Sequence, residues 1–135
     1  VQDGALSGTT GKAKRLEAMV LQLTGKPVGG GVRYQSHVQT YGWESGWKQS
    51  GELSGTEGEA KRLEAIRIQL TGEMEKQYDI YYRVHIQTYG WLGWAKNGES
   101  AGTEGLGKRM EAIQIRLVKK GEKAPTGTGA EAFIK

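Results

Sequence analysis

The chain repeats itself, and this constrains its fold more than any other feature. His37–Trp43 (HVQTYGW) returns 48 residues later as His85–Trp91 (HIQTYGW). A second segment, which opens on Gly-Thr and ends in a basic and then apolar run, occurs three times: Gly8–Leu23, Gly55–Leu70 and Gly102–Leu117. A period of ~20–50 residues is typical of architectures in which one unit cannot bury its apolar face alone. We therefore expect one functional site per repeat.

Alignment on the Gly-Thr motif predicts how the chain is organised. The first copy is only a half-repeat, because Val1–Gly4 aligns with Lys48–Gly51, directly after the second Trp of a complete unit. A chain of 135 residues has the length of one ordinary domain with a single core. We predict one domain, 1–135, with a half-repeat at 1–25, complete repeats at 32–72 and 80–118, and a loop with a short closing strand at 119–135.

Composition excludes several classes of protein. There is no cysteine and there are only two histidines, His37 and His85, so we expect no disulfide framework, no metal centre and no cofactor. The net charge of +4 comes from interleaved acidic and basic residues, which is typical of a solvated surface and not of a nucleic-acid partner. No apolar run approaches the roughly 20 residues of a membrane helix, so membrane insertion is not expected. The N-terminus is not signal-like, although a signal peptide could lie upstream because the chain starts inside a repeat.

The local signals for helix and strand conflict in one segment. Glu59–Ala65 contains good helix formers, and Leu63, Ile66 and Leu70 fall at near-helical spacing. All three copies, however, alternate apolar and mostly polar residues, and this period of two favours half-buried strands. The alternating positions are Met19, Leu21 and Leu23 in the first copy, Ile66, Ile68 and Leu70 in the second, and Ile113, Ile115 and Leu117 in the third.

Tyr34–Tyr41 and Tyr82–Tyr89 are also predicted strands, because they are rich in aromatic and β-branched residues. The fold class is therefore all-β. We predict a pseudo-threefold repeat domain, β-prism-like or trefoil-like, with the three alternating apolar triplets converging in its core. An open tandem array of small β units is the alternative.

The repeated aromatic residues are the first candidates for a binding site. A flat indole or phenol ring can stack on the apolar face of a sugar, so Trp47, Trp94, Tyr41 and Tyr89 are candidate ligand-binding residues. Trp43 and Trp91 are predicted to be core residues, since a large aromatic in every repeat often fills the hydrophobic centre. His37, Gln39, His85 and Gln87 could bond to sugar hydroxyls, or could instead satisfy buried backbone groups where units meet.

An Arg-x-Glu pair occurs in all three copies: Arg15 with Glu17, Arg62 with Glu64, and Arg109 with Glu111. In the strand interpretation each Glu shares a face with the apolar residues that follow, so its carboxylate needs a partner. We predict a structural latch with the neighbouring Arg, the His or the Gly-Thr turn. A glycosidase requires two carboxylates about 5–10 Å apart across a bond, whereas each unit offers one. No catalytic residue and no enzyme activity are expected.

The combined pattern resembles the ChW repeat, a clostridial hydrophobic repeat with a characteristic Trp. The residues that carry it are His-x-Gln-x-x-Gly-Trp, a second Trp, Gly-Thr-x-Gly and Arg-Leu-Glu-Ala-Ile, over nearly all of residues 1–118. The resemblance implies a secreted or cell-surface protein with a non-catalytic binding or attachment role, and it names no ligand. A glycan or polysaccharide is the first candidate partner; a protein-protein adhesion or scaffold role, including self-association, is the alternative.

Overall fold

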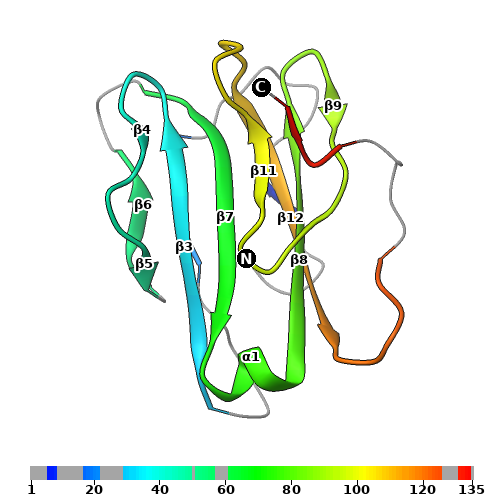
Figure 1. The fold of residues 1–135 in the computed structure, drawn as a ribbon. Helices are drawn as coiled ribbons and strands as arrows, with labels where there is room; N and C mark the ends of the chain where they lie inside the picture. Colours follow the sequence, from blue (N-terminus) through cyan, green and yellow to red (C-terminus); the bar gives the residue numbers. More distant parts are fainter. Residues whose placement is uncertain are drawn as a thin grey trace.

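The all-β prediction is confirmed. The computed structural model describes residues 6–8, 17–21, 29–49, 51–56, 61–125 and 131–134, most of them in strands (Figure 1). The elements are β1 (Leu6–Gly8), β2 (Ala18–Val20), β3 (Gly31–Val38), β4 (Gly42–Trp43), β5 (Lys48–Gln49), β6 (Leu53–Gly55), β7 (Leu63–Thr71), α1 (Glu73–Gln77), β8 (Tyr78–Ile86), β9 (Gly90–Trp91), β10 (Ala95–Lys96), β11 (Ser100–Thr103), β12 (Met110–Lys119) and β13 (Phe133–Ile134).

Each complete repeat is built on two long antiparallel strands. In repeat 2, β3 pairs with β7, and Tyr34 lies opposite Ile68. In repeat 3, β8 pairs with β12, and Tyr82 lies opposite Ile115. The Trp-bearing segments fold back onto the first strand of each pair: β4 and β5 onto β3, and β9 and β10 onto β8. The alternation in the sequence therefore folds as strands and not as a helix.

Strands are also paired between repeats. β11 of repeat 3 pairs with β7 of repeat 2, and β6 of repeat 2 pairs with β2 of repeat 1. β1 of repeat 1 returns to pair with β12 of repeat 3. The register is the same each time, with the glycine of the Gly-Thr motif opposite the alanine of Glu-Ala: Gly55 with Ala18, Gly102 with Ala65, and Gly8 with Ala112.

This cyclic exchange is a threefold relation among the three copies, since in an open array the first and last repeats would not pair. The described strands form three sheets, in the orders β1-β12-β8-β10, β13-β11-β7-β3-β4 and β2-β6, and none of these closes into a barrel. The predicted all-β fold of repeated units is thus what the structure has. The tail contributes β13, which adds to β11 in parallel.

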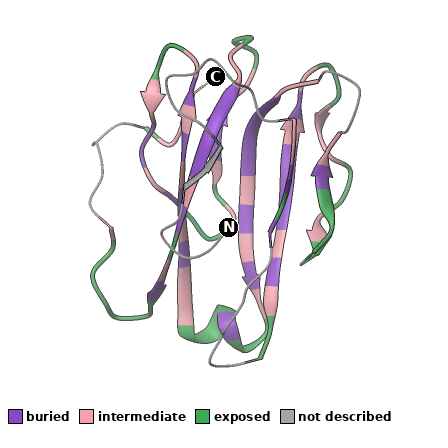
Figure 2. Ribbon diagram, turned by 180° about the vertical axis from the view of Figure 1, so that it is seen from behind, coloured by how far each residue is buried: buried purple, intermediate pink, exposed green. Residues whose placement is uncertain are grey.

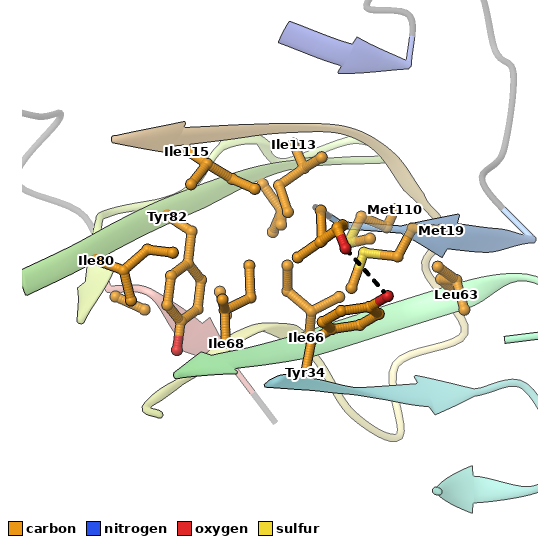
Figure 3. Packing of buried hydrophobic residues seen from close by; sticks show 14 of the residues in the cluster. Met19, Tyr34, Leu63, Ile66, Ile68, Ile80, Tyr82, Met110, Ile113 and Ile115 are labelled. Atoms are coloured by element: carbon orange, nitrogen blue, oxygen red, sulfur yellow. Dashed lines mark hydrogen bonds between the residues drawn. The ribbon is translucent and has the colours of Figure 1, made fainter. Parts of the chain in front are cut away.

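The core lies where the inner faces of the three sheets meet (Figure 3). Buried and partly exposed residues alternate along the long strands (Figure 2). The apolar triplets of all three copies contribute: Met19, Leu21, Ile66, Ile68, Leu70, Ile113 and Ile115 belong to one buried cluster, and Leu117 packs against its margin. Leu23 lies outside the described residues. Tyr34 and Tyr82 are also fully buried, and their hydroxyls donate to the main-chain carbonyls of Glu52 and Glu99, respectively.

Repeats 2 and 3 are joined by the short helix α1, which follows β7 and precedes β8 at one end of the sheets (Figure 1). Met74 on α1 is fully buried and closes that end of the core. In the described part of the chain, no helix is long and apolar enough to cross a membrane.

Asp79 ties β8 to two other segments. Its Oδ1 accepts from Lys120 Nζ at 2.6 Å and from Asn97 Nδ2 at 2.9 Å, and Lys96 Nζ lies 3.8 Å from Oδ2. The hydrogen bond from Lys120 lowers the pKa of Asp79 below its ordinary value of 3.8. A lowered folded-state pKa adds stability above the ordinary pKa, and this stability is lost as the pH falls through the folded-state value.

We expect Asp79→Asn to cost about 0.5–1 kcal/mol of unfolding free energy at neutral pH, because the ion pairs are partly exposed. The difference from the parent should shrink as the pH falls through the lowered folded-state pKa of Asp79, because the carboxyl is then protonated in both states. Urea denaturation at neutral and at acid pH measures this. Glu122→Gln, an exposed acidic residue nearby, is the matched control for loss of charge. An equal loss for Asp79→Asn at both pH values would contradict the expected linkage.

Candidate functional site: two equivalent aromatic and cationic surfaces

The turn after the first long strand presents the most exposed aromatic residues. Tyr41 is 57% exposed and its counterpart Tyr89 is 45% exposed. In both turns the preceding threonine adopts a left-handed backbone, with φ of 74° at Thr40 and 76° at Thr88. A β-branched residue rarely adopts this conformation, and strain of this kind often accompanies a functional site. The same exposed ring on the same strained turn therefore occurs twice.

A lysine lies beside each of these turns. Lys61 Nζ donates to Thr40 Oγ1 at 3.2 Å and lies 5.6 Å from the centre of the Tyr41 ring. In repeat 3, Lys108 Nζ donates to Thr88 Oγ1 at 3.3 Å. Each exposed turn therefore combines a tyrosine or threonine hydroxyl with a primary amine, which can bond to polar or acidic groups of a ligand.

The first Trp of each repeat lies on the outer face, which corrects the prediction that Trp43 and Trp91 are core residues. Both are half-buried and neither belongs to the buried cluster. Trp43 lies opposite His37 in the ladder and packs edge-on against it, with ring centres 5.3 Å apart; in repeat 3, Trp91 packs on His85 at 5.4 Å. The reason is the pleat, because the inward positions of β3 are already taken by Tyr34 and its alternate neighbours.

In repeat 2 an arginine lies over each tryptophan. The guanidinium carbon of Arg67 lies 3.8 Å from the centre of the Trp43 ring, and that of Arg33 lies 5.0 Å from Trp47. Such cation–π contacts stabilise the ring orientation and bring a positive charge to the aromatic surface. Trp47, a predicted candidate for ligand binding, is half-buried.

In repeat 3 a single arginine serves both tryptophans. Arg83 lies 4.8 Å from the ring centre of Trp91 and 4.8 Å from that of Trp94, which is also half-buried. We call Trp43, Trp47, Arg33, Arg67 and His37 the aromatic cluster of repeat 2, and Trp91, Trp94, Arg83 and His85 the aromatic cluster of repeat 3.

The arginine beside the first Trp comes from different strands in the two repeats. Arg67 on β7 donates to Gln35 Oε1 of β3 at 3.1 Å, and these residues are opposite in the ladder. In repeat 3 the pair is exchanged, since Arg83 is on the first strand and donates to Gln114 Oε1 on the second at 2.9 Å. The exchange keeps one guanidinium at the outer face beside the Trp. These arginines were not among the site residues predicted from the sequence, although comparison of Gln35 and Arg67 with their counterparts could have revealed them.

The predicted Arg-x-Glu latch is present in both described copies. Arg62 Nε donates to Glu64 Oε2 at 3.0 Å, and Arg109 Nε donates to Glu111 Oε2 at 3.2 Å. In repeat 3 the other carboxylate oxygen is hydrogen bonded to His85 Nδ1 at 3.1 Å.

In repeat 2, His37 Nδ1 is equally close to Glu64, 3.1 Å from Oε1, but is not aligned for a hydrogen bond. Of the first copy's pair, Arg15 lies outside the described residues, and Glu17 is half-buried next to β2.

The glutamates were predicted to share a face with the apolar residues that follow them, and this prediction was wrong. A β-bulge is the reason. The register of β3 with β7 shifts between His37 and Val38, which leaves Glu64 as the extra residue, and the same shift occurs at Glu111. The bulge turns the carboxylate toward the outer-face histidine and away from the apolar cluster. Glu64 is buried but is not part of that cluster.

The repeated glutamines serve the fold through their side-chain oxygens. Gln39 Oε1 accepts from the main-chain N–H of Arg62 at 3.2 Å, and Gln87 Oε1 accepts from that of Arg109 at 3.4 Å. The structure therefore places Gln39 and Gln87 where they satisfy backbone donors at the turn. Their positions correspond to the structural alternative that the sequence left open.

A residue from the neighbouring repeat completes the aromatic cluster of repeat 2. Trp43 Nε1 donates to Glu104 Oε1 at 3.2 Å, and His37 Nε2 lies 3.8 Å from the same oxygen. Glu104 follows β11, so the strand exchange between repeats carries it there. Sequence reasoning missed this residue because its contact depends on a pairing between strands far apart in the chain.

The side chains of these two surfaces can bind a ligand through stacking and hydrogen bonds. Among the described residues, no group of three histidines and acidic residues is placed to hold a metal ion. Each histidine lies against a carboxylate that is itself paired with arginine. The groups that face outward are rings, guanidinium ions and amines, which can stack and donate hydrogen bonds.

Comparison with known proteins agrees with this repeated arrangement. The sequence profile of the ChW family, described as Clostridial hydrophobic W, matches residues 1–25, 37–72 and 85–119, which together make up most of the chain. No curated protein and no solved structure matches the chain. The three family matches correspond to the half-repeat and the two complete repeats seen in the strand pairing. The chain is therefore a member of the ChW repeat family.

Proposed function

We propose that this chain is a non-catalytic binding module of an extracellular protein, and that it binds glycans at two equivalent surface sites. Each site consists of the exposed tyrosine turn and the adjoining aromatic cluster of one complete repeat. The observation that carries the proposal is the exposed ring on a strained threonine turn, which is present at Tyr41 and again at Tyr89. A ring that stays about half exposed buries less apolar surface on folding than a core ring does, so its recurrence at the same turn favours a ligand that stacks on it.

The surrounding groups support a sugar ligand. Rings can pack on the apolar C–H face of a pyranose, while Lys61 and the guanidinium groups donate to hydroxyl or carboxylate oxygens. Two sites on one module increase the apparent affinity for a polymer, because binding at one site raises the effective concentration at the other. An extracellular location fits the family, whose repeats often occur in extracellular proteins.

The proposed absence of catalysis is supported by how the titratable groups are used. Glu64 and Glu111 are each engaged by an arginine and lie beside a histidine. Both carboxylates are therefore already engaged, and the Ser54 hydroxyl that donates to Glu44 is fully buried, where a substrate does not reach it.

A glycan panel tests this function directly. We expect soluble neutral or uronic-acid polysaccharides to change the Trp fluorescence of the parent in a saturable way, without release of new reducing ends. Tyr41→Ala, Tyr89→Ala, Trp47→Ala and Trp94→Ala should each weaken binding. Loss of both tyrosines should lower affinity for a polymer by roughly tenfold or more, because stacking and avidity are both removed.

Leu106→Ala is the matched control, since Leu106 is also an exposed apolar residue but belongs to neither site. It should leave glycan binding unchanged. A panel that binds nothing, or affinities that are the same in the double tyrosine variant and the parent, would refute the proposal.

A further inference from the structure

One strand of the threefold arrangement has fewer neighbours than its counterparts. β7 lies between β3 and β11, and β12 lies between β8 and β1. β2 is the counterpart of these two strands in the first copy, and among the described residues it pairs only with β6. No described strand lies beside β2 at the position that β3 and β8 occupy in the other two sheets.

The backbone of β2 has groups that face this position. The carbonyls of Glu17 and Leu21 accept from Thr56 and Gly51 of repeat 2, so they face β6. Because N–H and C=O groups of successive strand residues face opposite edges, those of Ala18 and Val20 face the other edge. An edge of this kind can pair with another extended chain.

The outer surface beside this edge is apolar, unlike its counterparts. Val20 and Leu53 lie opposite each other in the β2–β6 ladder and are 45% and 38% exposed. Val20 corresponds to Arg67, which in repeat 2 lies over Trp43 of the Trp-bearing hairpin. The exposed pair is thus located where a docked Trp-bearing strand would cover it.

The inner face points to the same occupant. Tyr34 of β3 donates its hydroxyl to the carbonyl of Leu21 in the preceding repeat, at 3.4 Å (Figure 3). Tyr82 of β8 is likewise fully buried, with its hydroxyl near the main chain of Ile68, the counterpart of Leu21. The third counterpart is Ile115, and a strand with a tyrosine at the equivalent place would bring a hydroxyl to its main chain.

We propose that the edge of β2 opposite β6, which pairs with no other described strand, binds an extended polypeptide strand with the first-half pattern of this repeat, Tyr-x-x-His-x-Gln-Thr-Tyr-Gly-Trp. The strand pairs antiparallel to β2, with its histidine opposite Ala18 and its tyrosine opposite Leu21, as in the other two sheets. Main-chain hydrogen bonds supply affinity, and the alternating tyrosine and Trp positions supply specificity. The occupant is thus a half-repeat from a ChW polypeptide, a ligand of another kind than the proposed glycan.

A labelled peptide tests the proposal on the intact chain. The peptide has the sequence of residues 31–49, which contains the complete pattern. We expect saturable binding by fluorescence anisotropy, at least tenfold tighter than that of a peptide with the same residues in an order that destroys the alternation. Val20→Pro removes an N–H at this edge of β2 but no bond to β6, so it should weaken binding at least tenfold. Leu106→Pro, in an exposed loop, is the matched control and should bind as the parent does.

Cross-linking tests the register even if Val20→Pro does not fold. The chain contains no cysteine, so Val20→Cys provides one reactive thiol. With oxidised glutathione added as the oxidant, a peptide with Gln35→Cys should form a disulfide at least fivefold faster than one with Arg33→Cys, because directly opposed strand residues are about 5 Å apart.

Three results would overturn the proposal: a folded parent that binds neither peptide, cross-linking that is the same at both peptide positions, or a dimer of the parent that is sensitive to Val20→Pro but is not dissociated by the peptide of residues 31–49. The last result would show that a second copy occupies the edge with a segment other than the half-repeat strand.

Discussion

Replacing Gly102 with alanine is expected to destabilise the protein by about 3 kcal/mol, or to prevent folding. A Cβ at Gly102 would lie 2.4 Å from the carbonyl oxygen of Glu64 and 2.6 Å from Ala65 Cα, and both are backbone atoms that cannot rotate away. The φ of 126° adds strain, since residues with a side chain rarely adopt it. Urea denaturation followed by Trp fluorescence measures the loss.

The same result is expected at the equivalent position of repeat 2, because a Cβ at Gly55 would lie 2.5 Å from the Glu17 carbonyl oxygen and 2.8 Å from Ala18 Cα. Gly121→Ala is the matched control: φ there is 89°, but no atom lies within 4 Å of the added carbon. Its cost should be only about 1 kcal/mol, from strain alone. If Gly102→Ala lowered the unfolding free energy no more than this control does, the close contact between β11 and β7 would be contradicted.

These glycines mark the part of the fold that the sequence did not predict in detail. The long strands were predictable because alternation over Ile66–Leu70 and its counterparts is strong and repeated. β6 and β11 are only a few residues long, too short for a recognisable period, and their partners are distant in sequence. Repetition predicted a threefold relation, but which strand crosses to which repeat depends on pairing between repeats.

The sequence predicted which residue types belong to the repeated surfaces, but not where each side chain lies or what it contacts. The repeats identify the rings, the histidines and the latch, because these residue types recur at fixed spacing. The prediction that Trp43 is a core residue was wrong. Alternation along a strand distinguishes its two faces, but it does not show against which face the segment after the strand will pack. Glu104 was missed because it belongs to another repeat, and the bulge at Glu64 is not encoded in a simple alternation.

Differences between repeats also limit prediction from an averaged pattern. In repeat 2, Glu44 Oε1 accepts from the main-chain N–H of Ser36 at 3.1 Å and from the Ser54 hydroxyl at 2.5 Å. The two serines are fully buried, and they also bond to each other. Repeat 3 has apolar residues at the corresponding positions: Val84, Leu92 and Ala101. The same backbone thus accommodates either a polar network or an apolar contact, provided that all three residues are replaced together.

Truncation of the shared core is expected to have the second large effect. Ile66→Ala and Ile113→Ala should each lower the unfolding free energy by about 3 kcal/mol, within the range of about 2–5 kcal/mol for such changes. Both side chains are fully buried, and although they come from different repeats they belong to the same apolar cluster (Figure 3). Leu106→Ala, at an exposed position, should change stability by no more than about 0.5 kcal/mol.

The shape of the unfolding curve carries as much information as its midpoint. If residues 1–135 form one domain, far-UV circular dichroism and Trp fluorescence should give coincident single transitions for the parent and for both core variants. All four tryptophans belong to repeats 2 and 3, so fluorescence reports on these repeats, whereas circular dichroism reports on every strand. Two separated transitions, with Ile66→Ala shifting one of them and Ile113→Ala the other, would show that the repeats fold independently. Because each triplet completes the burial of the other two, we expect the chain to unfold as a single unit.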